Sequence, residues 1–563
     1  MHEATGVSRL STIPSMPQST RYYPLLILIL SAVFYLPFLG RVHLFDWDEI
    51  NFAESAREML VTGNYARVQI NFEPFWEKPP LFFWLQATAM RVLGVGEYAA
   101  RLPNALTGIA TLLTFFFVGK RLHGPQFGLL WAIGYLGALT PHLYFKTGII
   151  DPTFNLFIFL GVCYLYEAVQ QYRRGAAGQA ALAGLFIGLA ILTKGPVGAL
   201  LAGLTFGVVW AITRFRPLLR FWHGLLAVVV ALGVASLWFG LEVIQNGPLF
   251  LEEFITYQIR LLTTPDAGHG QPFYYHFVVV LIGCFPLSVF AIRYLWAGRD
   301  VRDFRLWMVV LFWVVMILFS IVKTKIVHYS SMAWFPVSYL AARHLHDLLT
   351  DRAQWSRWLT AGLVFVGGLL GVLLTALPVV GRFKTALIPY IKDRFAVANL
   401  QAPVQWNGWE WGIGAAYLAV LITAILQLAR YVRQRQRLPE NNLPGPVWAL
   451  FGSTAVCLWL YLSLIVHNIE EYVQGAAVRF YETKQGQPVY AENIGYKSYA
   501  QLFYLRKQPP IDPRTRESDF LLNGPVDRPT FFITKITEAN QYRTNPNLVL
   551  EREENGYVMF RRK

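Results

Sequence analysis

Apolar segments of about twenty residues recur along most of this chain, and they constrain its fold more than any other feature of the sequence. A helix needs about 20 apolar residues to cross the hydrocarbon core of a bilayer. Of the 563 residues, 55% are hydrophobic and only 15% are charged, whereas a soluble chain of this length would carry more charge. The sequence therefore predicts a polytopic α-helical membrane protein.

Hydropathy along the chain predicts about thirteen membrane-spanning helices. A polar N-terminal segment precedes the first of them, and no small-residue cleavage site follows it, so we expect that helix to be retained. The predicted spans are 22–40, 103–119, 126–145, 152–170, 178–193, 196–213, 222–241, 276–294, 306–322, 329–346, 358–379, 410–429 and 446–466.

Basic residues gather in alternate loops between these spans, and this pattern explains the net charge of +15 without a nucleic-acid partner. The residues concerned are Lys120, Arg121, Arg173, Arg174, Arg214, Arg216, Arg220, Arg293, Arg299, Arg302, Arg305, Arg352, Arg357, Arg430, Arg433, Arg435 and Arg437. If all the predicted spans are present, these loops share one side of the membrane. The positive-inside rule makes that side cytoplasmic.

The chain is predicted to form two domains. Residues 1–466 form the membrane domain, whose outer side carries the juxtamembrane loops 41–101 and 242–275. Within the first loop, KPPLFFWLQATAMRVLG predicts a helix lying at the membrane interface. Residues 467–563 carry more charge, and VYAENIG, TFFITKI, LVLERE and YVMFRR read as short strands around the helix KSYAQLFYLRK. We expect a small C-terminal α/β domain on the outer side.

A cluster of acids follows the first span directly, in FDWDEINFAESAREM, residues 45–59. Any one of these acids could be a solvated loop residue. However, Asp46, Asp48 and Glu49 lie among Phe45, Trp47 and Phe52, which are uncommon on loop surfaces. Acids in an aromatic setting favour a lined cavity.

Three other stretches on the outer side hold charged side chains. They are Glu77 and Lys78 in FEPFWEKPPLFFW, Arg260 and His269 in RLLTTPDAGHGQPFYYH, and Lys323 and Lys325 in SIVKTKIVHYSSMAW. Lysines on the side poor in cations break the positive-inside pattern, which favours anion binding, although a snorkelling lysine is the simpler alternative. Glu77 and His269 together provide two metal ligands, which are too few to define a site.

These residues combine carboxylates with a separate set of cations. Lys78, Arg260, Lys323 and Lys325 are suited to neutralising a phosphate. Asp48 is suited to act as a base or to stabilise a cationic sugar centre. The combination predicts transfer of a group from a lipid phosphate at the membrane surface.

The ordered motifs DE, REM, GNY, WEKPPLFFWL and RLPNAL resemble those of the lipid-linked-sugar glycosyltransferases of the GT-C class. The resemblance covers roughly the first 350 residues and is nearest to the protein O-mannosyltransferase and aminoarabinose (lipid A) transferase branch. It implies a multi-pass protein of the bacterial inner membrane, with a polyprenyl (undecaprenyl) phosphate sugar donor bound on the periplasmic side.

The resemblance also implies roles for individual residues. The catalytic acid corresponds to Asp48 of the Asp48–Glu49 pair, and the second acid corresponds to Asp151 in KTGIID. Donor-phosphate contacts correspond to Lys78, Arg260 and Tyr329, beside the lysine-rich turn with Lys323 and Lys325. Glu77 and His269 correspond to positions that hold a divalent metal, zinc or magnesium or manganese, in the family. Asn51 stands where aminoarabinose transferases tend to carry arginine, and KTKIVHY also departs from the family pattern, so the sugar and the acceptor stay open.

The leading hypothesis is a monomeric glycosyltransferase that transfers a sugar, such as 4-amino-4-deoxy-L-arabinose, to a lipid A-like glycolipid. Transfer to a protein hydroxyl, as in protein O-mannosyltransferases, is the alternative within the class. A lipid or sugar transporter (flippase) is the alternative from another class, and a scaffold acting through the C-terminal domain is a third. Transporters usually place ionisable residues at mid-membrane in related repeats, whereas these charges cluster on one side and no internal repeat is evident.

Overall fold

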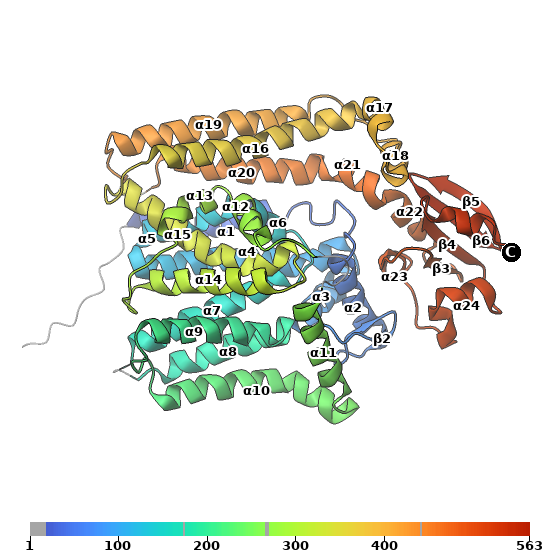
Figure 1. Cartoon of the computed structure of the whole chain (residues 1–563), viewed down its shortest axis with the longest axis horizontal. Coiled ribbons are helices and arrows are strands. Elements are labelled where there is room, and N and C mark those ends of the chain that lie inside the picture. The colour runs from blue at the N-terminus through green and yellow to red at the C-terminus, as the bar shows by residue number, and fades with distance from the viewer. Residues whose placement is uncertain (1–17, 173–174, 265–269, 440–441) are drawn as a thin grey trace, which may run out of the picture.

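The computed structural model describes residues 18–172, 175–264, 270–439 and 442–563. Its long helices run side by side in one bundle, and a domain of strands and short helices lies at one end of that bundle (Figure 1). The loops joining α9 (Val197–Ile212) to α10 (Phe221–Asn246) and α19 (Trp411–Arg433) to α20 (Gly445–Leu464) lie at the opposite end. These two basic loops therefore lie away from the C-terminal domain, as the charge pattern predicts.

Within the described residues, eight helices are long and apolar enough to cross a membrane, or nine if one bent pair counts as a single span. The eight are α4 (Glu97–His123), α7 (Asp151–Gln170), α8 (Ala177–Lys194), α10, α14 (Phe304–Ile321), α16 (Arg357–Arg382), α19 and α20. The bent pair is Tyr275–Gly283 (α12) with Leu287–Tyr294, which includes α13 (Leu287–Ala291), and it turns by 111°. Shorter apolar helices are Thr20–Tyr35, which contains α1 (Tyr23–Tyr35), α3 (Leu81–Leu93) and α9.

Every predicted span has a helical counterpart, but some are broken. The predicted span 126–145 divides into α5 (Pro125–Leu136) and α6 (Leu139–Tyr144). The division falls at Gly137, which packs directly against the Phe451 backbone of α20, leaving no room for a side chain. The predicted span 329–346 begins as the 3-10 helix η4 (Val327–Ala333) and continues as α15 (Trp334–Leu349). The multi-pass helical fold is confirmed, whereas the count of thirteen stays a prediction.

Small residues allow neighbouring helices to pack closely. Gly184 and Gly188 lie four residues apart on α8 and face α10, where a Cβ at Gly188 would be 2.8 Å from the Ala231 carbonyl oxygen. Between α4 and α5, the Phe115 and Trp131 rings stack with centroids 4.4 Å apart. Close backbone approach and aromatic packing of this kind replace the hydrophobic effect as the force that holds helices together in lipid.

A layer of short elements covers the end of the bundle that faces the C-terminal domain (Figure 1). It contains α2 (Asp48–Thr62), the hairpin of β1 (Gln69–Ile70) and β2 (Glu73–Pro74), α3 and α11 (Leu249–Thr263). The predicted helix of the first loop is thus present as α3. Further short helices of the chain are α17 (Lys384–Leu387) and α18 (Arg394–Leu400).

The C-terminal domain is joined to the bundle by helix. After α20 the chain continues through α21 (Val466–Glu470), a π-helical turn and α22 (Ala476–Lys484). The sheet has the order β3-β4-β6-β5, with β3 (Tyr490–Asn493) parallel to β4 (Thr530–Lys535). The strands β5 (Leu548–Glu554) and β6 (Tyr557–Arg562) are antiparallel to each other. The short helices are α23 (Ala500–Tyr504), α24 (Ser518–Asn523) and α25 (Ala539–Arg543).

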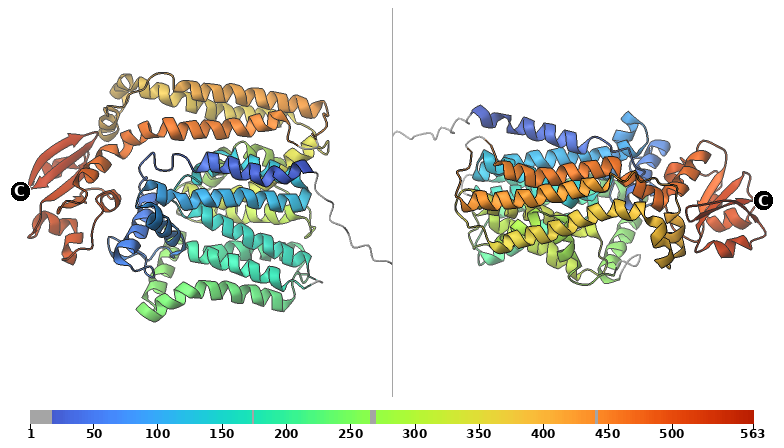
Figure 2. Two further views of the ribbon diagram at one scale, coloured as in Figure 1. Left: turned by 180° about the vertical axis from the view of Figure 1, so that it is seen from behind. Right: turned by 90° about the horizontal axis from the view of Figure 1, so that it is seen from above.

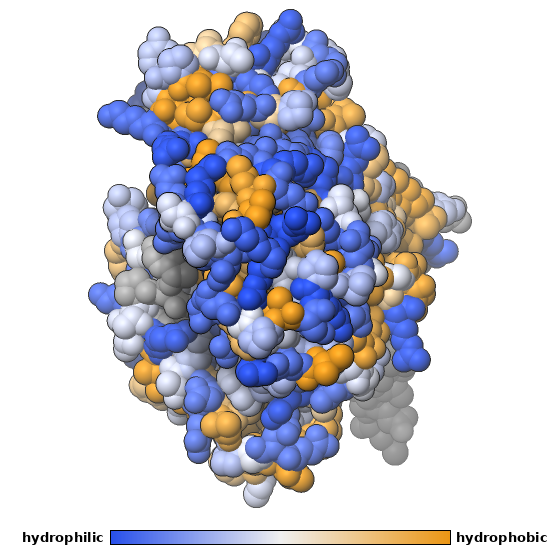
Figure 3. Space-filling view, turned by 90° about the vertical axis from the view of Figure 1, so that its right-hand side faces the viewer, coloured by the Kyte–Doolittle hydropathy of each residue, from blue (hydrophilic) through white to orange (hydrophobic). Residues whose placement is uncertain are grey.

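Both faces of this sheet are covered. Phe531 and Ile533 of β4 pack into the cluster shared with α2, α22 and α23, while Phe532 packs with Val558 and Phe560 on the other face. This alternation follows from the two-residue repeat of side chains along a strand. Viewed from the end that carries this domain, the molecular surface is predominantly hydrophilic (Figure 3), and Figure 2 shows the domain projecting beyond the bundle.

Candidate active site

Many of the predicted site residues meet in one cavity of about 410 Å³, beneath the layer of short elements. Residues at the ends of α2, α7, α8, α9 and α14, in the 3-10 helix η4 and in the middle of α11 line the cavity. The charged and polar residues that line it are Asp48, Glu77, Lys78, Asp151, Asn155, Lys194, Tyr257, Gln258, His328, Tyr329 and Ser331.

Asp48 enters the cavity from the N-terminus of α2, where the helix dipole favours a carboxylate. Its side chain is 40% exposed, and its Oδ2 lies 3.5 Å from Nε2 of His328. Burial lowers the pKa of His328, against the opposing effect of the Asp151 and Asp48 carboxylates.

Asp151 and Lys194 form a buried ion pair in the same cavity. Asp151 is the first residue of α7, Lys194 is the last residue of α8, and Nζ donates to Oδ1 over 2.6 Å. The Lys194 ammonium also lies 5.4 Å from the centroid of the Tyr329 ring. Lys194 was not among the predicted site residues, because the sequence TKGP reads as a turn between two spans. A lysine at the outer end of a span is the signal that could have identified it.

Lys78 lies just before α3, and the prolines Pro79 and Pro80 fix the backbone there. Its Nζ lies 3.6 Å from the Glu77 carboxylate and 5.1 Å from the centroid of the Tyr257 ring on α11. The Arg260 guanidinium, one turn further along α11, lies 5.1 Å from the same ring centroid. Tyr257, which sequence reasoning missed, therefore connects the two predicted phosphate-binding cations. Arg260 itself is exposed and is not part of the cavity wall.

The lysine-rich turn contributes less to the cavity than the sequence predicts. Lys323 is exposed, and the Lys325 side chain is buried, where Nζ donates to the Val322 carbonyl over 2.8 Å. Neither lysine lines the cavity, whereas Tyr329 does. In the next turn of α7, Asn155 donates to the Ser331 hydroxyl over 2.8 Å, which ties α7 to η4.

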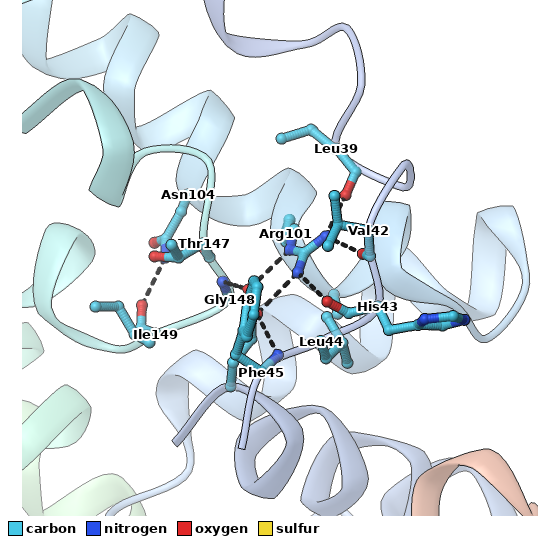
Figure 4. Close-up of polar contacts among 12 residues, drawn as sticks. Leu39, Val42, His43, Leu44, Phe45, Arg101, Asn104, Thr147, Gly148 and Ile149 are labelled. Atoms are coloured by element: carbon cyan, nitrogen blue, oxygen red, sulfur yellow. Dashed lines mark hydrogen bonds and ion pairs between the residues drawn. The ribbon is translucent and has the colours of Figure 1, made fainter. Parts of the chain in front are cut away.

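Glu49 lies next to Asp48 in the sequence but outside the cavity wall, and it is 4% exposed. Its carboxylate accepts from Nε and Nη2 of Arg101, each over 2.8 Å, and from the N–H groups of Phe45 and Gly148. Burial acts to raise the pKa of Glu49, but Arg101 and these N–H donors hold it below its usual value. The same guanidinium donates to the carbonyls of Leu39, Val42 and His43 (Figure 4). Glu49 therefore binds Arg101 and the neighbouring backbone instead of facing the cavity.

The predicted metal site is only half within the described residues, because His269 lies outside them. Glu77 is present, and its nearest charged partner is the Lys78 ammonium. Across the described ranges, no group of three or more His, Cys, Asp or Glu side chains is arranged to hold a metal ion. A protein metal site normally has three or four such ligands, so the described side chains alone do not fit one.

Comparison with known proteins places this arrangement among glycosyltransferases. The profile of the dolichyl-phosphate-mannose-protein mannosyltransferase family matches residues 77–239. The undecaprenyl phosphate-α-4-amino-4-deoxy-L-arabinose arabinosyl transferase of Edwardsiella ictaluri is 30% identical over 442 residues, which cover 74% of this chain and 79% of that protein. The enzyme of the same name from Enterobacter sp. strain 638 is 28% identical over 343 residues, covering 59% and 61%.

The fold is similar to a solved structure over nearly its whole length. The crystal structure of ArnT from Cupriavidus metallidurans bound to undecaprenyl phosphate superimposes with a TM-score of 0.75 at 20% identity. The match covers 95% of this chain and 97% of that one, and therefore includes the C-terminal domain.

Proposed function

The chain belongs to the family of the undecaprenyl phosphate-α-4-amino-4-deoxy-L-arabinose arabinosyl transferases, and from this premise we propose the reaction that it catalyses. It is a glycosyltransferase that transfers 4-amino-4-deoxy-L-arabinose from undecaprenyl phosphate to a lipid A-like glycolipid. The reaction takes place on the periplasmic face of the bacterial inner membrane, and the chain acts as a monomer.

One observation carries this proposal: a single cavity joins the Asp48 carboxylate to the ammonium groups of Lys78 and Lys194. Its wall also includes apolar side chains of the bundle helices, among them Leu200 and Leu318. Its volume of about 410 Å³ suits a sugar phosphate head, and its apolar wall suits the first part of a lipid tail. The cavity thus matches a donor whose one end is anionic and whose other end is hydrocarbon.

The reaction breaks the bond between the sugar C1 and the phosphate oxygen, and the electron pair remains on the phosphate. Lys78 stabilises this developing charge, with Arg260 and Tyr329 as further phosphate contacts. C1 meanwhile gains positive character, which the Asp48 carboxylate stabilises. An acceptor phosphate is already an anion and forms the new bond to C1 directly. An acceptor hydroxyl would instead lose its proton to Asp48.

The other predicted residues have supporting parts in the proposal. Asp151 holds Lys194 at the cavity, and Lys323 and Lys325 contribute positive potential from outside its wall. Glu49 orients the start of α2 through Arg101. A divalent metal at Glu77 and His269 stays a prediction, and the chemistry above uses only the side chains of this chain.

The alternatives are less well supported. The aminoarabinose transferase of Edwardsiella ictaluri matches 74% of this chain, whereas the mannosyltransferase profile matches only residues 77–239, and this supports aminoarabinose over mannose as the donor sugar. A flippase would need ionisable groups along a path through the membrane, whereas the groups described here gather at one end of the bundle.

The test compares glycolipids by mass spectrometry in strains of the native host. The strains are a deletion, the wild-type complement, the Asp48→Asn complement and an Asp527→Asn complement as an exposed-acid control. We expect the mass of one aminoarabinose to disappear on deletion, to return with wild type and with Asp527→Asn, and to stay absent with Asp48→Asn. Unchanged glycolipids in all strains would overturn the proposed acceptor.

A further inference from the structure

We propose that the C-terminal domain positions Asp48 for the reaction, with Gln474 and Tyr504 as positioning residues that act through the 43–47 segment. This segment connects the end of α1 with Asp48 at the start of α2. The inference rests on the proposed function, because it takes Asp48 as the reacting carboxylate.

The backbone of Leu44 is held at both of its polar atoms by the C-terminal part of the chain. Its N–H donates to the Tyr504 hydroxyl oxygen over 2.6 Å, and its carbonyl accepts from Nε2 of Gln474 over 2.9 Å. Both hydrogen bonds are buried and join residues more than 400 positions apart in the chain. They fix the backbone four residues before Asp48.

Contacts with the same domain continue up to Asp48. The Asp46 carboxylate accepts from the Tyr499 N–H over 3.2 Å. The Trp47 ring packs edge-on against the Tyr499 ring, with centroids 5.4 Å apart, and the Lys497 ammonium lies 5.0 Å from the Trp47 ring centroid. Trp47 is the residue directly before Asp48, so the C-terminal domain reaches the edge of the catalytic site.

At its other end, the segment is anchored by ion pairs. Nδ1 of His43 lies 3.0 Å from Glu470 at the end of α21, and Nε2 lies 3.6 Å from Glu482 of α22. The membrane domain contacts the opposite side, where Arg101 binds the His43 carbonyl and Glu49 accepts from the Phe45 N–H (Figure 4). The segment is therefore held between the two domains, and its position depends on both.

The chemical consequence follows from the geometry of group transfer. A displacement of about 1 Å in a reacting group can cost about 100-fold in rate. The phosphate-side cation Lys78 lies just before α3, and Lys194 is the last residue of α8, so neither cation belongs to the 43–47 segment. Loosening the segment should therefore lower kcat while leaving donor binding nearly unchanged.

The experiment uses the full-length protein in lipid nanodiscs, with undecaprenyl phosphate-linked 4-amino-4-deoxy-L-arabinose as donor and lipid A as acceptor. The variants are Tyr504→Phe, which removes only the acceptor of the Leu44 N–H, and Gln474→Leu, which removes the donor to the Leu44 carbonyl. We expect each to lower kcat by about 10-fold or more and to change the donor KM by less than about 3-fold.

Matched controls come from the same domain. Tyr490→Phe removes a hydroxyl bonded to Asp527, and Gln487→Leu removes an amide bonded to the Thr483 carbonyl. Both bonds lie at exposed positions. We expect both controls to retain wild-type kcat and KM, because neither bond touches the 43–47 segment.

A double-mutant cycle separates positioning from a general loss of structure. In single turnovers with excess enzyme, Tyr504→Phe should lower the rate in the Asp48 background and change it by less than about 2-fold in the Asp48→Asn background. A loss that persists after Asp48→Asn, or wild-type kcat in both Tyr504→Phe and Gln474→Leu, would overturn this inference alone. Full activity of Asp48→Asn itself would overturn the catalytic role of Asp48 and the inference with it.

Discussion

Lys194 at the end of α8 donates to Asp151 at the start of α7 over 2.6 Å, and both side chains line the cavity that Asp48 enters. The pair is nearly buried, with side-chain exposures of 13% for Lys194 and 5% for Asp151. It joins two neighbouring helices at the cavity, so it has a structural role as well as an electrostatic one.

The two roles of this pair can be separated. Lys194→Met leaves Asp151 as an unpaired buried charge, and we expect the free energy of unfolding to fall by about 3–5 kcal/mol. Adding Asp151→Leu should restore thermal stability, because an apolar pair can replace a buried ion pair, but it should not restore transfer. Thermal unfolding and transfer by each variant measure this. The exposed control Arg121→Gln, which breaks a pair with Glu167, should change neither by much. Recovery of activity in the double variant would contradict a role for the charges.

Tyr257 is predicted to organise the donor phosphate site. Its ring contacts both Lys78 and Arg260, so Tyr257→Leu frees both cations from their shared support. We expect the donor KM to rise by about 10-fold, with a smaller change in kcat, since positioned cations bind the phosphate before and during reaction. Initial rates over a range of donor concentrations test this. Tyr390→Leu, which removes an 84% exposed ring, is the control. An unchanged KM for Tyr257→Leu would remove this ring from the donor site.

Arg101 is predicted to be irreplaceable by lysine. Its guanidinium donates to three carbonyl groups and to both oxygens of Glu49, whereas an ammonium has only three protons. We expect Arg101→Lys and Glu49→Gln each to lower the free energy of unfolding by about 3 kcal/mol or more. Asp48→Asn, one residue away from Glu49, should leave thermal stability close to wild type while lowering the transfer rate strongly. Equal stability of Glu49→Gln and Asp48→Asn would contradict the distinct positions of these two acids.

The His43 ion pairs predict a pH dependence of stability. Burial acts to lower the pKa of His43, but the carboxylates of Glu470 and Glu482 outweigh it and raise this pKa to about 10. The folded state therefore binds a proton more tightly than the unfolded state, whose histidine has a pKa near 6.5. The resulting stability is complete below about pH 6.5 and is lost as the pH rises through about 10. Thermal unfolding between these pH values should show a steeper decline for wild type than for His43→Gln. Parallel declines would exclude His43 as the group responsible.

Hydropathy predicts where helices lie in this chain, and the number of them that cross the membrane stays a prediction. Hydropathy detects the apolar run 126–145 but not its division at Gly137. That division depends on the contact of Gly137 with Phe451, which is distant in sequence. The strands of the C-terminal domain were predicted by their alternation. The helix around α23 is shorter than KSYAQLFYLRK, because Tyr504 and the residues after it turn toward Leu44 and α2.

The site was predicted in part for a similar reason. Asp48, Lys78 and Asp151 stand beside aromatic residues or prolines at the ends of apolar runs, which is a local signal. Tyr257 carries no such signal, since its importance comes from a partner outside its own helix. Lys194 carries only its place at the outer end of a span, and its pairing with Asp151 is a tertiary contact. Glu49 could not be distinguished from Asp48 in sequence, because only the tertiary partner Arg101 separates their positions.

Because Glu49 meets Arg101 while Asp48 lines the cavity, the number of residues between Phe45 and Asp48 is fixed. Successive residues of an α-helix point about 100° apart, since one turn takes about 3.6 residues. Adding or deleting one residue between Phe45 and Asp48 would rotate the start of α2, so that Glu49 would no longer meet Arg101 and Asp48 would no longer line the cavity. Substitutions at these positions alter single contacts, but an insertion would break the fold and the chemistry together. A change of register in this short stretch therefore disturbs two sites at once.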